Sequence, residues 1–295
     1  MKKFLSNIFF FTIKIVMIIF ILIYFFNNFS NKPIKSKKYI LDNKDYFEVL
    51  IMGSSHAYVG VNPDFLSFKS INLAYNDRHL KNDISILNKF LDEFPKVKAI
   101  IMPSDYFTLW HDSNENEHNS ITKAHFDINM SLFDWILHPQ LCRLNCLRGE
   151  EKSGNGFRPN HKKLSEYDSI KINKMIINRI NTFHTDMLSN NINKVSSDLL
   201  LSLENLVQRC QKKNVILLFV EYPVIKSLRE KYKDSLKKIN LINYAHKRNW
   251  KNLNLNQYKF NDSLFNDVDH LNFDGAKKAS KIIDSVLIKL LKQSY

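Results

Sequence analysis

"LIMGSSHAYVGVNP", residues 50–63, is the stretch that decides the fold. An apolar run stops at Gly53, and two serines and a histidine follow at once. The run is short and rich in β-branched and aromatic residues, so we expect a strand over residues 46–53. A glycine lets the backbone turn sharply, and the serine after such a turn can expose its hydroxyl. The sequence therefore places Ser54 and Ser55 at the carboxyl end of a buried strand.

Expected strands and helices alternate along the rest of the chain. Further strands are expected over residues 70–75, 97–103, 215–223 and 250–260, and helices over residues 80–94, 196–214, 225–248 and 274–292. This alternation is typical of βαβ units, so it predicts an α/β fold with a parallel sheet. Residues 104–190 are polar, and we interpret them as an insertion of short helices and loops that caps one end of the sheet.

The first 38 residues predict a membrane anchor followed by a basic linker, which leaves residues 39–295 as one α/β domain. From Ile8 to Phe26 only Thr12 and Lys14 interrupt the apolar run, and a helix of about 20 apolar residues spans a bilayer. The run ends in bulky residues rather than in a small-residue cleavage site, so we expect an uncleaved anchor. Lysines flank both ends, and the positive-inside rule taken alone would place the domain in the cytoplasm.

Composition excludes some functions. The net charge is +14, but the lysines are spread along the chain without a nucleic-acid-binding signature, so we expect no nucleic-acid partner. Attraction to an anionic membrane or polymer is the favoured alternative. The three cysteines form no metal signature, and we expect no metal or cofactor. Cys142 and Cys146 could form a disulfide outside the cytoplasm or could be ordinary small residues.

A second motif lies near the other end of the chain. In "FNDVDHLNFDGAKKAS", residues 265–280, Asp267 stands three residues before His270. A nucleophilic serine needs a base, and the base needs a carboxylate that fixes its orientation. Taken singly, the serines could be plain helix caps, and the loop with His270 could be an acidic surface loop. Together, the two motifs predict a Ser-His-Asp arrangement beyond the carboxyl ends of the strands, where open parallel sheets bind ligands.

The stretches "IMGSS" and "DVDHLNFDGA" resemble the first and last signature blocks of the SGNH, or GDSL-like, hydrolases and acyltransferases. The resemblance covers roughly residues 46–292. It implies a flavodoxin-like, three-layer fold in which Ser55 is the nucleophile, His270 the general base and Asp267 its orienting acid. Ser54 stands where the family usually has an aspartate.

The two middle blocks depart from the family's pattern. "NLAYND", residues 72–77, replaces the block with the oxyanion glycine, so Ala74 or Asn76 would have to offer a backbone N–H there. "MPSDYF", residues 102–107, lacks the family's asparagine. Ser54 and His56, beside the nucleophile, are further candidates for substrate binding, although a residue in the position of His56 is more often packed or capping.

A "GSS" start behind a membrane anchor resembles one branch of the family, which includes proteins of D-alanyl transfer and polysaccharide O-acetylation. This implies a serine O-acyltransferase or esterase, with acetyl as the first candidate group, that acts on a cell-envelope polysaccharide. It also implies an outward-facing domain at the cytoplasmic membrane and a multi-pass acyl exporter as partner. The alternative from another class is a non-catalytic protein of the same fold that binds glycan or scaffolds an envelope complex. A third interpretation is an esterase held on the cytoplasmic face.

Overall fold

The computed structural model describes residues 2–29, 37–109, 126, 155–189, 197–232 and 241–293. Its centre is one five-stranded sheet in the order β2-β1-β3-β4-β5, and every pairing is parallel. The strands are β1 (Val49–Ile51), β2 (Ser70–Asn72), β3 (Ala99–Pro103), β4 (Ile216–Glu221) and β5 (Asn252–Asn254). The predicted α/β fold with a parallel sheet is therefore confirmed.

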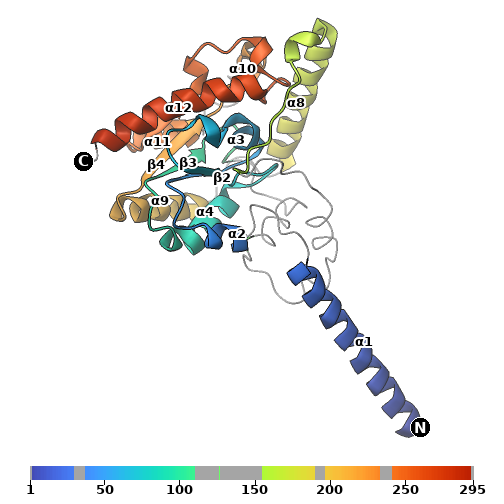
Figure 1. Cartoon of the computed structure of the whole chain (residues 1–295). Helices are drawn as coiled ribbons and strands as arrows, with labels where there is room; N and C mark the ends of the chain where they lie inside the picture. Colours follow the sequence, from blue (N-terminus) through green and yellow to red (C-terminus); the bar gives the residue numbers. More distant parts are fainter. Residues whose placement is uncertain are drawn as a thin grey trace.

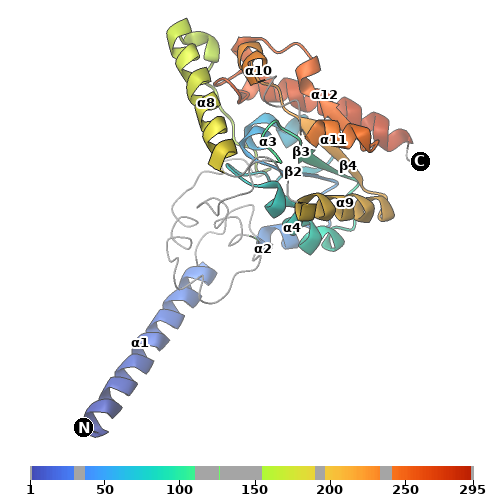
Figure 2. The ribbon, with the colours of Figure 1, turned by 180° about the vertical axis from the view of Figure 1, so that it is seen from behind.

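Helices pack on both faces of this sheet, so the domain has three layers (Figures 1 and 2). Successive strand residues point to opposite faces: Val49 and Ile51 join one apolar core, whereas Leu50 and Met52 join the other. The first core includes residues of α3 (Ser55–Gly60), α8 (Ser169–Ser189), α10 (Lys226–Tyr232) and α12 (Phe273–Gln293). The second includes residues of α2 (Lys37–Asp42), α4 (Leu80–Phe90), α9 (Ser197–Lys212) and α11 (Leu241–Lys247).

Short 3-10 turns join several of these elements: η1 (Pro63–Phe65), η2 (Leu91–Glu93), η3 (Leu164–Glu166), η4 (Leu255–Gln257) and η5 (Asp262–Leu264). The helix expected over residues 80–94 consists of α4 and η2. The helix expected over residues 225–248 is two helices, α10 and α11, and residues 233–240 between them lie outside the described residues.

The expectation of short helices in residues 104–190 is wrong for α8, which has 21 residues. Ile172, Met175, Ile176 and Ile180 pack against the first core, and their spacing gives α8 one apolar stripe. Burial of this stripe stabilises a helix much longer than the polar composition indicated. Most of the remaining insertion, with Cys142 and Cys146, lies outside the described residues.

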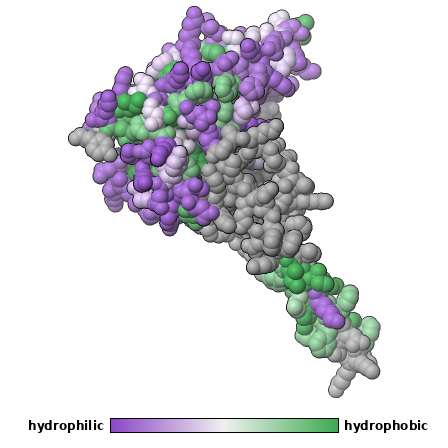
Figure 3. All heavy atoms as spheres, in the orientation of Figure 1, coloured by the Kyte–Doolittle hydropathy of each residue, from purple (hydrophilic) through white to green (hydrophobic). Residues whose placement is uncertain are grey.

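Helix α1 (Lys2–Phe29) extends away from the domain in Figure 1. Its described side chains are mostly apolar (Figure 3), and several are exposed, among them Phe9, Phe11 and Met17. Within the described part of the chain, no helix meets the length and apolarity needed to span a membrane. The anchor expected over residues 1–38 stays a prediction.

Candidate active site

A sharp turn after β1 places the first site residue. Gly53 has φ = +125°, a backbone conformation that side-chain-bearing residues rarely adopt. A Cβ there would also lie 2.9 Å from Pro103 Cγ at the end of β3. The Gly53 carbonyl accepts a hydrogen bond from Tyr75 N at 2.9 Å. The turn is thus fixed between its two neighbouring strands, and α3 begins immediately afterwards at Ser55.

Ser55 and His270 meet although 215 residues separate them. The distance from Ser55 Oγ to His270 Nε2 is 2.8 Å, and His270 Nδ1 lies 3.0 Å from each carboxylate oxygen of Asp267. An ionised carboxylate can only accept hydrogen bonds, so the proton of a neutral imidazole resides on Nδ1. Nε2 then accepts the Ser55 hydroxyl proton. This is the arrangement that the two sequence motifs predicted.

The loop around Asp267 is held by its own hydrogen bonds. Asp267 Oδ1 accepts the backbone N–H groups of Asp269 at 3.1 Å and His270 at 2.9 Å, and Oδ2 accepts the side-chain amide of Asn266 at 3.0 Å. Asn272 Oδ1 accepts Gly275 N at 3.0 Å in the first turn of α12. The carboxylate and imidazole are therefore positioned by the short segment that leads into α12.

A buried ionic cluster lies behind His270. The His56 ring is fully buried, with Nδ1 3.3 Å from Asp105 Oδ2 and Nε2 3.3 Å from Asp269 Oδ2. Asp269 Oδ2 also accepts Tyr106 OH at 3.1 Å and Arg179 Nε from α8. Asp269 Oδ1 lies 3.3 Å from His270 Nδ1. Two carboxylates, not one, thus face the same imidazole nitrogen.

The charge states within this cluster follow from its contacts. Burial alone would lower the pKa of His56, but Asp105 and Asp269 raise it to about 9. Burial opposes ionisation of Asp269, yet His270, Arg179 and His56 hold its pKa well below the usual range. His56 is therefore a buried cation and Asp269 a buried anion at neutral pH.

The other predicted site residues are placed as follows. Ser54 is buried, and its hydroxyl makes no hydrogen bond to any described residue. Of the two alternatives for His56, the structure has the packed one, because a fully buried ring cannot contact substrate. Ala74 N donates to Asn72 Oδ1 at 3.0 Å, so this amide is already engaged. Asn76 is half-buried in the turn after β2, and its role as an oxyanion donor stays a prediction.

Three residues of the site escaped the sequence analysis: Asp105, Asp269 and Arg179. Asp105 lies in "MPSDYF", where its carboxylate accepts Tyr222 N at 3.0 Å as well as pairing with His56. Its position directly after a strand was a usable signal. Asp269 lies inside the quoted loop, but nothing in the sequence shows which way it points. Arg179 lies on α8, far from both motifs.

No protein-family model matches the chain, and no curated protein does. Several solved structures are similar. A proposed acylhydrolase from Bacteroides fragilis is 10% identical, with a TM-score of 0.42 over 88% of this chain and 100% of that chain. A GDSL-like lipase from Bacteroides thetaiotaomicron is 9% identical, with a TM-score of 0.36 over 84% of this chain and 88% of that one.

A proposed lipolytic protein of the G-D-S-L family from Desulfitobacterium hafniense is 10% identical, with a TM-score of 0.36 over 81% of this chain and 98% of that one. At these identities and TM-scores, the likenesses do not assign an activity to this chain.

Proposed function

We propose that this protein is an SGNH-type serine enzyme that removes or transfers an O-linked acyl group. The observation that carries the proposal is the chain of contacts from Ser55 Oγ through His270 to Asp267, with distances of 2.8 and 3.0 Å. A hydroxyl, an imidazole and a carboxylate in this order are the parts that activate a serine nucleophile.

In the proposed reaction, Ser55 Oγ attacks the acyl carbonyl carbon while His270 Nε2 accepts its proton. The tetrahedral intermediate collapses, and His270 returns the proton to the departing alkoxide, which leaves as an alcohol. A second hydroxyl, from a sugar or from water, then gives its proton to His270 and attacks the acyl-serine. The acyl group departs on that oxygen, and Ser55 regains its proton. Asp267 stabilises the imidazolium in both halves of the cycle.

The developing oxyanion needs donors near Ser55. The first backbone N–H groups of a helix have no intrahelical acceptor, and Ser55 opens α3. We propose the Ser55 amide as one donor and the region of Asn76 as the source of another. The hydrogen bond from Ala74 to Asn72 makes Ala74 the weaker candidate.

The finer parts of the proposal rest on the sequence. The apolar run from Ile8 to Phe26 supports anchoring in the cytoplasmic membrane. The resemblance to envelope proteins supports an outward-facing domain, an acetyl group, a cell-envelope polysaccharide as substrate and a multi-pass acyl exporter as partner.

The test uses the full chain in mild detergent with p-nitrophenyl acetate. We expect intact-mass measurement to show addition of one acetyl group, its absence in Ser55→Ala, and its presence in Ser85→Ala, which removes a half-buried serine hydroxyl on α4. Envelope glycans added to the acetylated enzyme should then remove the acetyl group faster than water does. A folded protein that never gains the acetyl group would instead favour the non-catalytic, glycan-binding alternative.

A further inference from the structure

The buried cluster behind His270 has a feature that a single orienting acid does not explain. Asp269 Oδ1 lies 3.3 Å from His270 Nδ1, beside the two Asp267 contacts at 3.0 Å. Asp267 is about a third exposed, whereas the Asp269 side chain is only 3% exposed. The His270 imidazole therefore faces one partly solvent-exposed carboxylate, Asp267, and one buried carboxylate, Asp269.

Three side chains contact the Asp269 carboxylate on the side away from His270. Its Oδ2 atom accepts Tyr106 OH at 3.1 Å and Arg179 Nε, and lies 3.3 Å from His56 Nε2. These partners come from α3, from the segment after β3 and from α8. Each fixes the oxygen that does not face His270, which leaves Oδ1 directed at the imidazole.

We propose that Asp269 is a second positioning residue for His270, sharing the Nδ1 proton with Asp267, and that Arg179 holds Asp269 in place. The proposal rests on the proposed acyl-transfer function. It explains why the buried side chains of Asp269 and His56 lie next to the pair of Asp267 and His270. Two carboxylates on one Nδ1–H keep the ring oriented even when the more exposed Asp267 moves.

A metal ion is the competing explanation, because ligand atoms of His56, Asp269 and His270 lie within 4.8 Å of one another. His56 lies 3.3 Å from both Asp105 and Asp269, and the Arg179 guanidinium already contacts the Asp269 oxygen that faces His56. A cation therefore already lies against the carboxylate oxygen that a metal ion would need. The contacts therefore favour a hydrogen-bonded cluster over a metal site.

The test compares Asp267→Asn with Asp267→Asn/Asp269→Asn in the full chain in detergent. In a triad with one aspartate, the asparagine variant loses about 10⁴-fold in kcat. We expect Asp267→Asn alone to lose no more than about 100-fold, and the double variant to lose about 10⁴-fold. A loss of about 10⁴-fold in Asp267→Asn alone would overturn the proposal.

Because Asp269→Asn also removes a partner of His56, a second variant keeps the test independent of folding. Arg179→Gln keeps the Asp269 side chain but removes its guanidinium partner, and Lys174→Gln on the exposed side of α8 is its matched control. In the Asp267→Asn background we expect Arg179→Gln to lower the acylation rate at least about 10-fold and Lys174→Gln to leave it unchanged. Equal rates for the two variants would overturn the role of Arg179.

A readout without activity separates this proposal from the proposed function. In the chain labelled with ¹⁵N-histidine, the downfield Nδ1–H proton signal of His270, assigned by its loss in His270→Gln, should persist in Asp267→Asn and vanish in the double variant. Loss of the signal in Asp267→Asn alone contradicts the role of Asp269. An inactive wild-type enzyme with a persistent signal contradicts only the acyl-transfer function.

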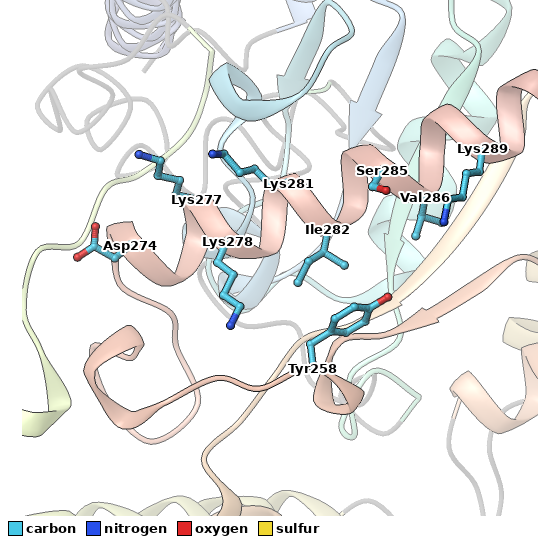
Figure 4. Close-up of a pocket in the computed structure, with 9 residues that line it drawn as sticks. All are labelled: Tyr258, Asp274, Lys277, Lys278, Lys281, Ile282, Ser285, Val286 and Lys289. Carbon is cyan, nitrogen blue, oxygen red and sulfur yellow. The ribbon is translucent and has the colours of Figure 1, made fainter.

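A second, independent observation concerns the outer face of α12. A hollow of about 590 Å³ lies along this helix, and four lysines line it: Lys277, Lys278, Lys281 and Lys289 (Figure 4). Its lining has one acidic residue, Asp274. The other acidic residue of α12, Asp284, accepts Ser67 N and Ser67 Oγ, each at 2.7 Å. Positive charge is thus concentrated along the hollow.

Aromatic rings hold two of these lysine side chains in position, but no acidic side chain of the described residues neutralises their charge. Lys277 Nζ lies 5.4 Å from the centre of the Phe65 ring, and Lys278 Nζ lies 5.0 Å from that of Phe260. In the described ranges, no carboxylate forms an ion pair with any of the four lysines. In Figure 4, Lys277 and Lys281 project from the side of α12 opposite to Lys278. Lys277 and Lys281 lie one helical turn apart, where like charges repel, so this part of α12 favours an anionic partner.

We infer that this hollow binds a linear anionic glycan. From Lys277 to Lys289 the helix rises about 18 Å at 1.5 Å per residue, which suits a chain with several negative groups. The hollow also has an apolar wall, including Ile282, and the exposed ring of Tyr258, on which a sugar ring can pack. The hollow is open and runs along α12 from Asp274 to Lys289, which suits an extended polymer chain.

The test measures binding of fluorescein-labelled polygalacturonate to the full chain in detergent. Lys281→Glu/Lys289→Glu should weaken binding at least about 10-fold, and added salt should weaken wild-type binding. Lys81→Glu/Lys212→Glu, which makes the same charge change on the opposite face of the sheet, should change it less than about 3-fold. Equal losses in the two variants would show attraction to net charge alone and overturn the inference. Preference for anionic vesicles over polygalacturonate would also overturn it.

Discussion

His56 shows how one buried residue links the site to stability. The ring keeps its proton because Asp105 and Asp269 flank it, and these contacts raise its pKa to about 9 despite burial. In the unfolded chain the pKa of a histidine is near 6.5. The folded protein therefore holds a proton that the unfolded chain releases between these two values.

This residue predicts a pH dependence of stability. The stabilisation is complete below pH 6.5 and is lost as pH rises through about 9, with a total of roughly 3 kcal/mol. We expect the urea midpoint of the full chain to fall between pH 7 and pH 9. His56→Gln should be less stable at pH 7 and should flatten this dependence. An unchanged slope in His56→Gln would show that another group is responsible.

At the residue scale, the contact between Asp267 and His270 could be predicted from the sequence because the motif is local. Asp267 and His270 lie three positions apart in one loop, so their contact depends little on the rest of the fold. A serine at the end of β1 could be added because the carboxyl ends of parallel strands share one edge, and the family resemblance implied Ser55 rather than Ser54. Arg179 and Asp105 could not be added, because their contacts depend on how α8 and the end of β3 pack.

At the scale of the elements, the packing of η5 against the start of α12 positions the loop that contains Asp267 and His270. Gly275 lies in the first turn of α12, and a Cβ there would lie 2.1 Å from the Leu264 carbonyl oxygen. This contact involves backbone, which a rotamer change cannot relieve. The loop between η5 and α12, which contains Asp267 and His270, depends on this close approach.

We therefore expect Gly275→Ala to lower the melting temperature and to reduce acylation of Ser55 at least about 10-fold, since overpacking commonly costs about 1–3 kcal/mol. Gly60→Ala in α3 is the control, because its Cβ would first meet a Tyr222 side-chain atom at 3.2 Å, which can shift slightly. If Gly275→Ala behaves like Gly60→Ala in both measurements, the close approach does not position the loop.

The elements themselves were predicted unevenly. All five strands lie within their expected ranges. β1, β3 and β4 are short apolar runs, which are readable without tertiary information, whereas β5 has asparagine at both ends. The length of α8 was missed although Ile172, Ile176 and Ile180 repeat at four-residue spacing. The polar residues around that stripe obscured it in the sequence. The stripe can be recognised as a helix face only from the core against which it packs.

At the scale of the whole molecule, the proposed function requires the domain to be outside the cytoplasm. The lysines that flank the apolar run, taken alone, favour a cytoplasmic domain. The family resemblance instead implies a domain outside the cytoplasm. The net charge of +14 suits anionic envelope polymers as well as anionic lipids.

Fusions to the carboxyl terminus decide the orientation. We expect an alkaline-phosphatase fusion to be active and a green-fluorescent fusion to be dark, because phosphatase folds outside the cytoplasm and the fluorescent protein does not. Both fusions should sediment with membranes. The reverse pattern, with a fluorescent fusion and inactive phosphatase, would place the site on the cytoplasmic face and leave a cytoplasmic esterase as the better proposal.

The central claim, that Ser55 is an activated nucleophile, is tested most directly by labelling the full chain with a fluorophosphonate. We predict stoichiometric labelling of Ser55, identified by peptide mass, and none in Ser55→Ala or His270→Gln. Ser54→Ala should still be labelled, because the Ser54 hydroxyl is buried and His270 contacts its neighbour instead. A folded wild-type protein without label, or a label that survives in Ser55→Ala, would contradict the account.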